Sequence, residues 1–366
     1  MDELLEEIFI RLPFDDPAIL FRAALVCKSW RLLISGHSLR RRLLEFHGSP
    51  PLRGFFCRVS GEPASRFVPA SSSSSLRCLS AGDVTPRWRP VDSLHGCVLV
   101  QDEGAPGLRV MHINLVVWNP SGGKARRLPR PPVFTYRWNA ILLCTTPGCD
   151  HLDCGYGDRQ FQVALAGTRP SDGLTYACVY SSEQRAWSKP ISAHLDGVQV
   201  KYDLGKQELS LIRPPVPDDV IWHDWHCVAL MRAEGDSLGF AMTQKFKLFM
   251  WSREAAGLDN GDAGWVQRRV IDLYEMIPDA WNHWVPFSAP KVSTVAERFG
   301  IIFIDTCVGL FSIDLKSGLV TKLLVSNYII RDVVPYVSFC TPAFGSRAAF
   351  AGDQEPSKFL NAGNFI

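Results

Sequence analysis

The stretch "VVWNPSGGKARRLP", from Val116 to Pro129, contains the unit from which most of the sequence is built. An apolar run ends near Trp118, a polar turn rich in Pro, Ser and Gly follows, and a second run then leaves. Short apolar runs bounded by such turn residues indicate β-strands, and two runs joined by one turn indicate a hairpin. The stretch therefore predicts a β-hairpin anchored by Trp118.

The same pattern recurs four more times. Its anchors are Tyr180 in "CVYSSEQRAWSKP", Tyr202 in "VKYDLGKQELSLI", Trp251 in "LFMWSREAAGLDNGDAGWVQRRVI" and Ile313 in "LFSIDLKSGLVTKLL". Repeated hairpins over roughly 300 residues predict a β-propeller, whose blades of four strands take about 40–50 residues each. We expect six or seven blades, with the strand at "GFFCRV" pairing with late sequence so that no long sheet edge stays exposed. Only 22 residues separate Tyr180 from Tyr202, so the blade near Ser192 to Tyr202 is expected to be incomplete.

Helical periodicity is confined to about the first 47 residues. Apolar residues recur there at helical spacing, which predicts three or four short helices. Pro13 ends the first, and Asp16-Pro17 is a typical start for the next. Acidic residues come first, and basic residues dominate from Arg22 to Arg42. A module this short buries little surface, so we expect part of its apolar surface to remain exposed.

Composition narrows the function classes. The chain has 366 residues, 46% hydrophobic and 21% charged, with a formal net charge of +2, which gives no general attraction to nucleic acid or membrane. The N-terminus is acidic and no run of about 18 apolar residues occurs, so neither a secretory signal nor a membrane span is predicted. The 11 cysteines lack paired spacing and suit a reducing compartment. We expect a location in the cytoplasm, the nucleus or both.

No catalytic or metal-binding constellation stands out. Two clusters lack the paired spacing of a structural zinc site: Cys144, Cys149, His151 and Cys154 in "CTTPGCDHLDC", and His223, His226 and Cys227 in "WHDWHC". There is no nucleophile motif and no interpretable pair of carboxylates. We predict no metal, no cofactor and no intrinsic enzyme activity.

One aromatic segment is a candidate binding patch. "IPDAWNHWVPF" concentrates four ring-bearing residues between prolines: Trp281, His283, Trp284 and Phe287. Such side chains are typical of binding patches on a propeller face. Packing over the edge of a blade is the alternative.

The first 47 residues also resemble a known family. "LPF-D" and "VCKSWR" are similar to the two most specific signatures of the F-box. Further along, "PPLRGFF", "HGCVLV", "VVWNPSGGK", "FQVALAG", "ACVYSSEQRAW" and "GWVQRRVIDL" resemble the plant F-box family, abundant in grasses, that adds a β-propeller-like C-terminal region. The resemblance implies an α+β multidomain protein, with a helical F-box over residues 1–47 and an all-β propeller-like target-binding domain over residues 48–366.

The resemblance implies a function for both parts. The chain would be the substrate-recognition subunit of an SCF-type E3 ubiquitin ligase, with the chemistry left to a conjugating enzyme. Its partners would be a Skp-type adaptor, through it a cullin scaffold, and an unknown protein target, with no nucleic acid or membrane. The residues that divide between internal packing and the adaptor interface would be Leu4, Leu5, Ile8, Leu12, Pro13, Leu20, Leu25, Val26, Cys27, Trp30 and Leu33.

Two departures from the family accompany this resemblance. The usual Leu-Pro before the first helix is absent, and a hairpin that relatives carry between Ser192 and Tyr202 is missing. Two other functions remain open: an interaction scaffold whose helices merely cap the propeller, and a propeller enzyme. The scaffold predicts burial of Leu5, Ile8, Leu25 and Trp30 against the same chain, whereas the enzyme needs converging ionisable groups in the central cleft.

Overall fold

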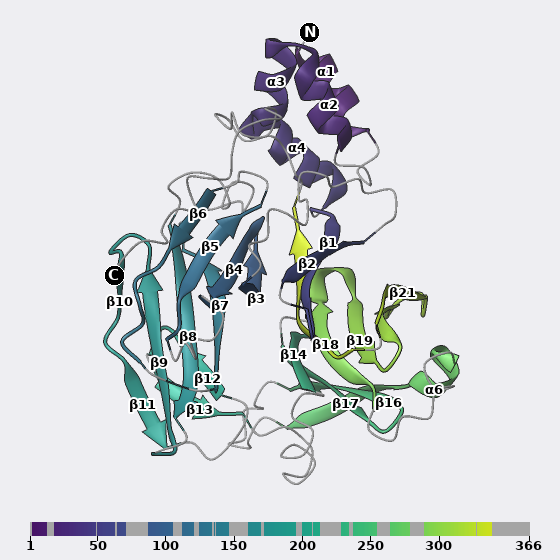
Figure 1. Ribbon diagram of the computed structural model, residues 1–366. Helices are drawn as coiled ribbons and strands as arrows, with labels where there is room; N and C mark the ends of the chain where they lie inside the picture. Colours follow the sequence, from purple (N-terminus) through teal and green to yellow (C-terminus); the bar gives the residue numbers. More distant parts are fainter. Residues whose placement is uncertain are drawn as a thin grey trace.

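The computed structural model shows a helical module joined to a ring of β-sheets (Figure 1). It describes residues 2–12, 18–48, 50–62, 64–70, 87–104, 112–120, 124–133, 135, 137–145, 160–169, 172–194, 200–206, 208–212, 228–233, 237–254, 264–278, 289–326 and 328–338. The fold is therefore an N-terminal helical module followed by an all-β propeller, as the sequence predicts.

Four short helices make up the module. They are α1 Asp2–Ile10, α2 Ala18–Val26, α3 Lys28–Ser35 and α4 His37–His47. Extended backbone at Cys27 separates α2 from α3, and the Cys27 Sγ accepts a hydrogen bond from the Trp30 backbone N–H at 3.4 Å, so the thiol caps α3. Gly36, also extended, ends α3 and begins α4.

An apolar core and a set of ion pairs hold the helices together. The buried residues are Phe9, Ile10, Leu20, Ala24, Ile34, Leu39 and Leu43. The Trp30 ring packs edge-on against Phe9, with the centroids 5.1 Å apart. On the polar side, Arg42 of α4 pairs with Glu6 at 3.1 Å and with Glu7. The acidic start of the sequence and its basic continuation therefore neutralise each other in part within the module.

Five sheets of three to five strands form the ring. One contains β3 Trp88–Leu94, β4 Cys97–Asp102, β5 Leu115–Asn119 and β6 Lys124–Arg127. The next contains β7 Arg137–Cys144, β8 Phe161–Arg169, β9 Leu174–Ser181, β10 Ala186–Trp187 and β11 Ile191–His194. A third contains β14 Val228–Arg232, β15 Leu238–Gln244, β16 Lys247–Arg253 and β17 Trp265–Asp272. A fourth contains β18 Lys291–Ala296, β19 Ile301–Thr306, β20 Gly309–Asp314 and β21 Val320–Val325. Short helices α6 Leu273–Met276 and η5 Glu297–Phe299 lie on the connections.

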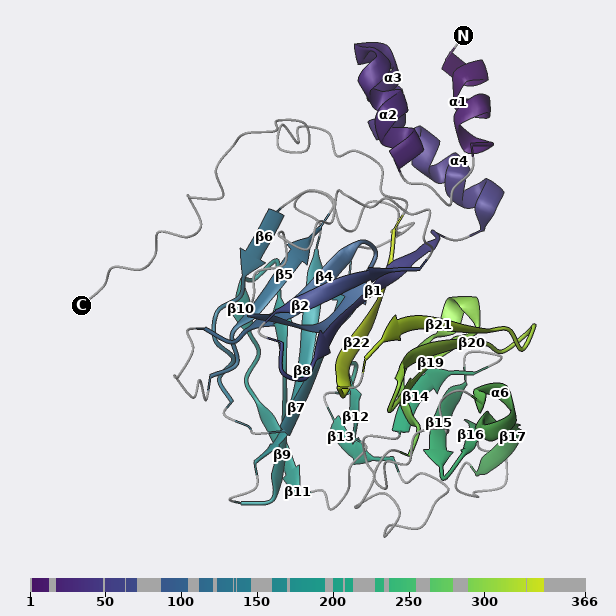
Figure 2. The same ribbon diagram turned by 45° about the vertical axis from the view of Figure 1, so that its right-hand side comes forward.

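The fifth sheet joins the two ends of the propeller. It has the order β2-β1-β22, with β1 Leu52–Val59, β2 Ser65–Pro69 and β22 Ile330–Val337. Strands β1 and β22 pair antiparallel and lie side by side below α4 (Figure 2). This pairing confirms the prediction that "GFFCRV" pairs with late sequence. We call β2-β1-β22 the closing sheet.

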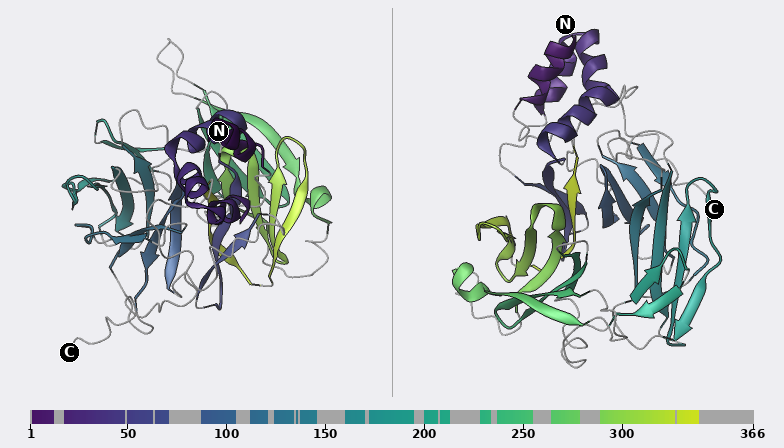
Figure 3. Two further views of the ribbon diagram at one scale, coloured as in Figure 1. Left: turned by 90° about the horizontal axis from the view of Figure 1, so that it is seen from above. Right: turned by 180° about the vertical axis from the view of Figure 1, so that it is seen from behind.

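The innermost strands of neighbouring sheets lie against one another. Contacts link β22 to β3, β3 to β7, β14 to β18 and β18 to β22. Seen from above, the sheets surround a centre over which the helical module lies (Figure 3). Phe21 of α2 packs against the apolar cluster that the closing sheet shares with the β3–β6 sheet, so the helices are seated on this part of the ring.

Apolar clusters between sheets hold the ring together, and buried polar groups add specific links. Asp92 of β3 accepts a hydrogen bond from the Leu142 backbone N–H of β7 at 2.7 Å, and burial raises the pKa of this carboxyl to about 6. Thr243 donates to the Pro290 carbonyl, just before β18, at 2.6 Å. Each bond joins one sheet to the next, so the ring order is secured by direction-dependent contacts as well as by burial.

The number of blades differs from the prediction. The part of the chain that the structure describes forms five blades, not six or seven. Where an incomplete blade was expected, β12 Val200–Asp203 and β13 Glu208–Leu211 pair only with each other to form a two-stranded sheet. The estimate of six or seven treated the chain as evenly spaced blades, whereas between His194 and Val228 the described residues contribute one hairpin.

Candidate functional site

The helical module presents apolar side chains to solvent. On α1, Leu4 and Ile8 are 70% and 57% exposed, one turn apart on the same face. At the end of α2, Leu25 and Val26 are 59% and 64% exposed, and Cys27 is exposed beside them. Exposed side chains of this size, grouped on one small module, are typical of a protein-binding surface.

The remaining predicted adaptor residues serve internal packing to different degrees. Leu5, Leu12, Trp30 and Leu33 are partly buried against the helical core, and Leu20 is buried within it. Pro13 lies outside the described residues. Trp30 is therefore both a packing partner of Phe9 and partly accessible to a binding partner.

Two exposed apolar residues were missed by the sequence analysis. Leu32 of α3 is half exposed, and so is Phe46 of α4. Leu32 follows Leu25 by seven residues, a spacing that repeats on one face of a continuous helix. The break at Cys27 interrupts that helix, so only the spacing itself could have drawn attention to Leu32.

The basic side chains of the module divide into two groups. Arg40 is buried and donates to the backbone carbonyls of Ser35 and Gly36, and Arg42 bridges to α1. The hydrogen bond that Arg42 donates to Glu6 and the nearby charge of Glu7 raise the pKa of Arg42. Lys28 and Arg31 remain exposed next to the apolar residues of α2 and α3. Of these four side chains, Lys28 and Arg31 are the two left available to an acidic partner.

The helical module matches a known family. Residues 2–45 match the family described as F-box-like. The module is an F-box-like domain. No curated protein matches this chain.

A solved structure shows a remote likeness. The WD40 domain of SCAP from fission yeast is similar over 75% of this chain and 50% of its own, at 10% identity and a TM-score of 0.26. This chain thus spans about half the length of that solved chain. A TM-score this low carries no argument about fold or function.

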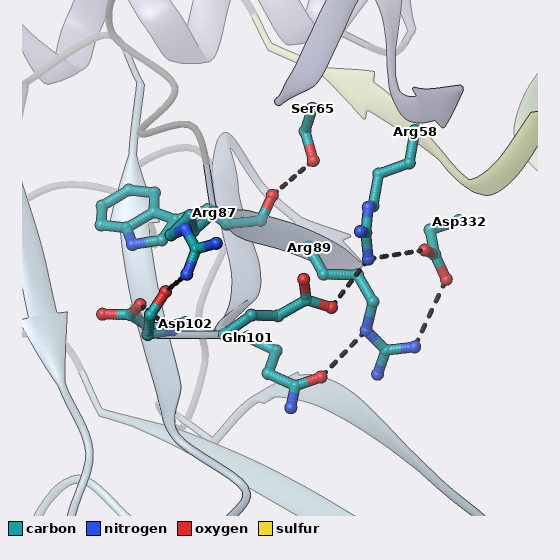
Figure 4. Close-up of polar contacts among 10 residues, drawn as sticks. Arg58, Ser65, Arg87, Arg89, Gln101, Asp102 and Asp332 are labelled. Atoms are coloured by element: carbon teal, nitrogen blue, oxygen red, sulfur yellow. Dashed lines mark hydrogen bonds and ion pairs between the residues drawn. The ribbon is translucent and has the colours of Figure 1, made fainter. Parts of the chain in front are cut away.

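A second group of polar residues lies at the end of the ring remote from the F-box-like domain. Strand β1 starts below α4 and runs away from it, so the antiparallel β22 starts at the far end. There, Asp332 of β22 lies 3.4 Å from Arg89 of β3 and 4.0 Å from Arg58 of β1 (Figure 4). Arg58 also pairs with Glu103 at 2.7 Å. The closing sheet and the β3–β6 sheet are therefore joined by a network of charges.

Further contacts extend this network to a third sheet. Arg89 donates to the Gln101 side chain at 2.9 Å, and its guanidinium lies 4.8 Å from the ring centroid of Trp138 in β7. The starts of β22, β3 and β7 thus lie side by side. We call Arg58, Arg89, Trp138, Arg331 and Asp332 the distal rim.

Asp332 has an unusual backbone conformation and environment. Its φ of 52° is rare for a residue with a side chain, and it lies where the register of β1 and β22 shifts. Burial raises the pKa of the Asp332 carboxyl, while the charges of Arg89 and Arg58 act in the opposite direction. The bulge therefore aims a carboxylate between two guanidinium groups.

The described residues hold no group of three or more His, Cys, Asp and Glu side chains placed to bind a metal. Of the two candidate zinc clusters, only Cys144 lies in the described part. Burial raises the pKa of the Cys57, Cys97 and Cys178 thiols to about 12, which keeps them protonated and poor as nucleophiles. In the same part of the chain, no helix is long and apolar enough to cross a membrane.

The predicted aromatic patch cannot be placed. Trp281, His283, Trp284 and Phe287 lie outside the described residues. In sequence they fall between α6 and β18. Their role in target binding stays a prediction.

Proposed function

We propose that this protein is the substrate-recognition subunit of an SCF-type E3 ubiquitin ligase. Its F-box-like domain binds a Skp-type adaptor, and through it a cullin scaffold, while the propeller binds a protein target. The chain itself contributes proximity, because holding a target beside the conjugating enzyme turns an encounter between two molecules into a local reaction. Such a subunit acts in the cytoplasm or nucleus and needs no active site of its own.

The observation that carries this proposal is the exposure of Leu4, Ile8, Leu25 and Val26 on an F-box-like domain. These side chains cost free energy in water, and binding to an apolar groove on a partner would recover it. Lys28 and Arg31 beside them suit an acidic partner.

A scaffold whose helices only cap the propeller accounts less well for this surface. That function predicts burial of Leu5, Ile8, Leu25 and Trp30 against the chain. Ile8 and Leu25 are instead exposed, and Leu5 and Trp30 are only partly buried. Phe21 performs the capping contact instead.

The test is co-precipitation of a Skp adaptor with the full chain and with single variants. Leu25→Ala and Ile8→Ala should each weaken binding by about 1–4 kcal/mol, the usual range for apolar anchors at an interface. Leu319→Ala is the matched control, because Leu319 is 66% exposed but lies on the β20–β21 connection. Circular dichroism should show all variants folded.

Trp30→Ala is a less selective variant, since removing the ring also removes its packing on Phe9. Failure of the unmodified chain to bind any Skp adaptor would contradict the ligase function and favour the scaffold. Equal binding by all three Leu and Ile variants would show that the exposed surface is not the adaptor interface.

A further inference from the structure

The distal rim has an uneven charge distribution. Arg58 of β1 and Arg331 of β22 are directly opposite in the antiparallel register. Like charges at such positions destabilise a sheet. Arg89 adds a third guanidinium from β3, and in the described part of the chain two carboxylates, Asp332 and Glu103, pair with these arginines. This local set therefore carries an excess of positive charge.

The two carboxylates are committed to only two of the arginines. Asp332 faces Arg58 and Arg89, and Glu103 faces Arg58. The Arg331 side chain is exposed and makes no hydrogen bond or ion pair with any described residue, although its charge acts on Asp332. Its planar guanidinium can bind a carboxylate with two parallel hydrogen bonds.

Apolar surface adjoins this arginine. Tyr328 is 66% exposed, and Ile329 is half exposed, in the connection that leads into β22. Trp138, with Arg89 stacked on it, lies on the other side of Arg58 and Asp332 within the rim. Tyr, Trp and Arg are the residue types that contribute most at protein interfaces.

We propose that the distal rim binds an acidic segment of the protein target, rich in Asp or Glu, with Arg331 as its main carboxylate contact. The inference rests on the proposed function, because it assigns the target to one face of the propeller. That face is at the opposite end of β1 and β22 from the F-box-like domain, so the adaptor and the target do not compete for the same surface. Nucleic acid is the competing polyanion, and it serves as the comparison ligand in the test.

The experiment uses the full purified chain, to which a Skp adaptor is added in a parallel sample, and a fluorescein-labelled decaglutamate peptide as the probe. Fluorescence anisotropy at low ionic strength reports its affinity. Arg331→Glu should weaken peptide binding about tenfold or more, because reversing a charge at a contact replaces attraction with repulsion. Arg331→Ala should give a smaller loss in the same direction.

Arg298→Glu is the matched control. Arg298 is also an exposed arginine, but it lies in η5 after the end of β18, away from the rim. It should leave peptide affinity within about twofold of the unmodified chain, because it lies just before Ile301, at the other end of β19 from Asp305, whose carboxylate accepts a hydrogen bond from the Ile330 N–H beside Arg331. Circular dichroism confirms that each variant is folded.

Equal losses in Arg331→Glu and Arg298→Glu would overturn the proposal, because they would mean attraction to the protein's overall charge. No peptide binding by the unmodified chain would overturn it too, and so would tighter binding of a single-stranded DNA oligonucleotide at the same ionic strength. Adaptor binding in the same preparations separates the two proposals. If the unmodified chain binds the peptide but no adaptor, only the ligase function is contradicted. If it binds the adaptor but no peptide, only this inference is contradicted.

Discussion

Asp305 shows how one buried carboxyl can make the stability of the ring depend on pH. It lies on β19, is buried, and accepts backbone hydrogen bonds from Ile330 and Thr306. Its Oδ1 atom has no hydrogen-bond partner among the described residues. Burial raises the pKa of this carboxyl to about 7, although Lys291 and the two backbone donors act in the opposite direction.

The direction of the pH effect follows from this shift. An unfolded Asp has a pKa of about 4, so between about pH 4 and 7 the folded chain binds a proton that the unfolded chain releases. The free energy of unfolding therefore falls as the pH rises through this window. Asp305→Asn removes the titration and keeps an acceptor for the Ile330 N–H.

We expect Asp305→Asn to be more stable than the unmodified chain at pH 8, with the difference shrinking by about 1–2 kcal/mol on going to pH 5. Urea unfolding of both chains at the two pH values measures it. Because other carboxyls titrate equally in both chains, their effects cancel. A difference that is the same at pH 8 and pH 5 would contradict the role given to Asp305.

At the level of elements, the repeated hairpin is the most informative signal in the sequence. Its anchors Trp118, Tyr180, Trp251 and Ile313 all lie on the third strand of a four-stranded order, and each pairs with the fourth. The fifth anchor, Tyr202, lies on the two-stranded β12-β13 sheet. In these four blades the motif therefore marks the two outermost strands and the turn that joins them.

The inner strands were harder to predict from sequence. They contact neighbouring sheets, so the choice of their side chains depends on packing against residues far away in the sequence and not on a local turn. Asp332 is an example, since a sequence gives no sign that this residue takes a positive φ between two arginines. Contacts between strands distant in sequence thus determine what a local pattern cannot, including the distal rim and the number of blades.

A glycine in the β19–β20 hairpin should be costly to replace in terms of the free energy of unfolding. Gly309 has a φ of 133°, and a Cβ atom there would lie 1.9 Å from the Leu324 carbonyl oxygen of β21. Gly309→Ala should lower the free energy of unfolding by about 2–4 kcal/mol, because both the backbone and the neighbouring strand must shift. Thermal unfolding measures the change.

Gly318 provides the comparison, since it also has a positive φ, of 73°, but open space around its Cα. Gly318→Ala should cost only about 1 kcal/mol, the conformational penalty alone. If the two substitutions cost the same, the close approach of β21 does not matter.

For the whole molecule, closure of the ring is the feature on which the other sheets depend. The closing sheet contributes Phe56 and Tyr336 to the cluster shared with the β3–β6 sheet, and Phe55 and Ile330 to the cluster shared with the β18–β21 sheet. The closing sheet thus covers apolar residues of both the β3–β6 sheet and the β18–β21 sheet. The division into a helical module and an all-β propeller could be predicted from periodicity, and so could this closure.

The exposed face of the F-box-like domain could be predicted only in part. Apolar spacing identifies Ile8 and Leu25, but the same spacing includes Leu20, which is buried. Residue type and period do not tell which side of a small helix bundle meets solvent, because that depends on how the helices cross. The structure was needed to separate them.

A chain ending at Tyr328, which lacks β22, should lose cooperative thermal unfolding. Removing that strand opens the β1 edge and uncovers both clusters that the closing sheet seals. Tyr336→Phe is the comparison, because it keeps the closing sheet and removes only the hydroxyl that donates to the Gly96 carbonyl at 3.3 Å. It should lower the free energy of unfolding by about 1 kcal/mol. A sharp transition in the shortened chain would show that closure is dispensable.

The pairing of β1 with β22 also imposes an order on synthesis. Roughly 270 residues separate the two strands, so at about 5–20 residues per second the ribosome needs about 15–50 s to deliver the partner of β1. The helices emerge first, while the edge of β1 that later pairs with β22 stays open during that interval. Under the proposed function, a nascent chain therefore presents its adaptor-binding helices before its target-binding ring has closed.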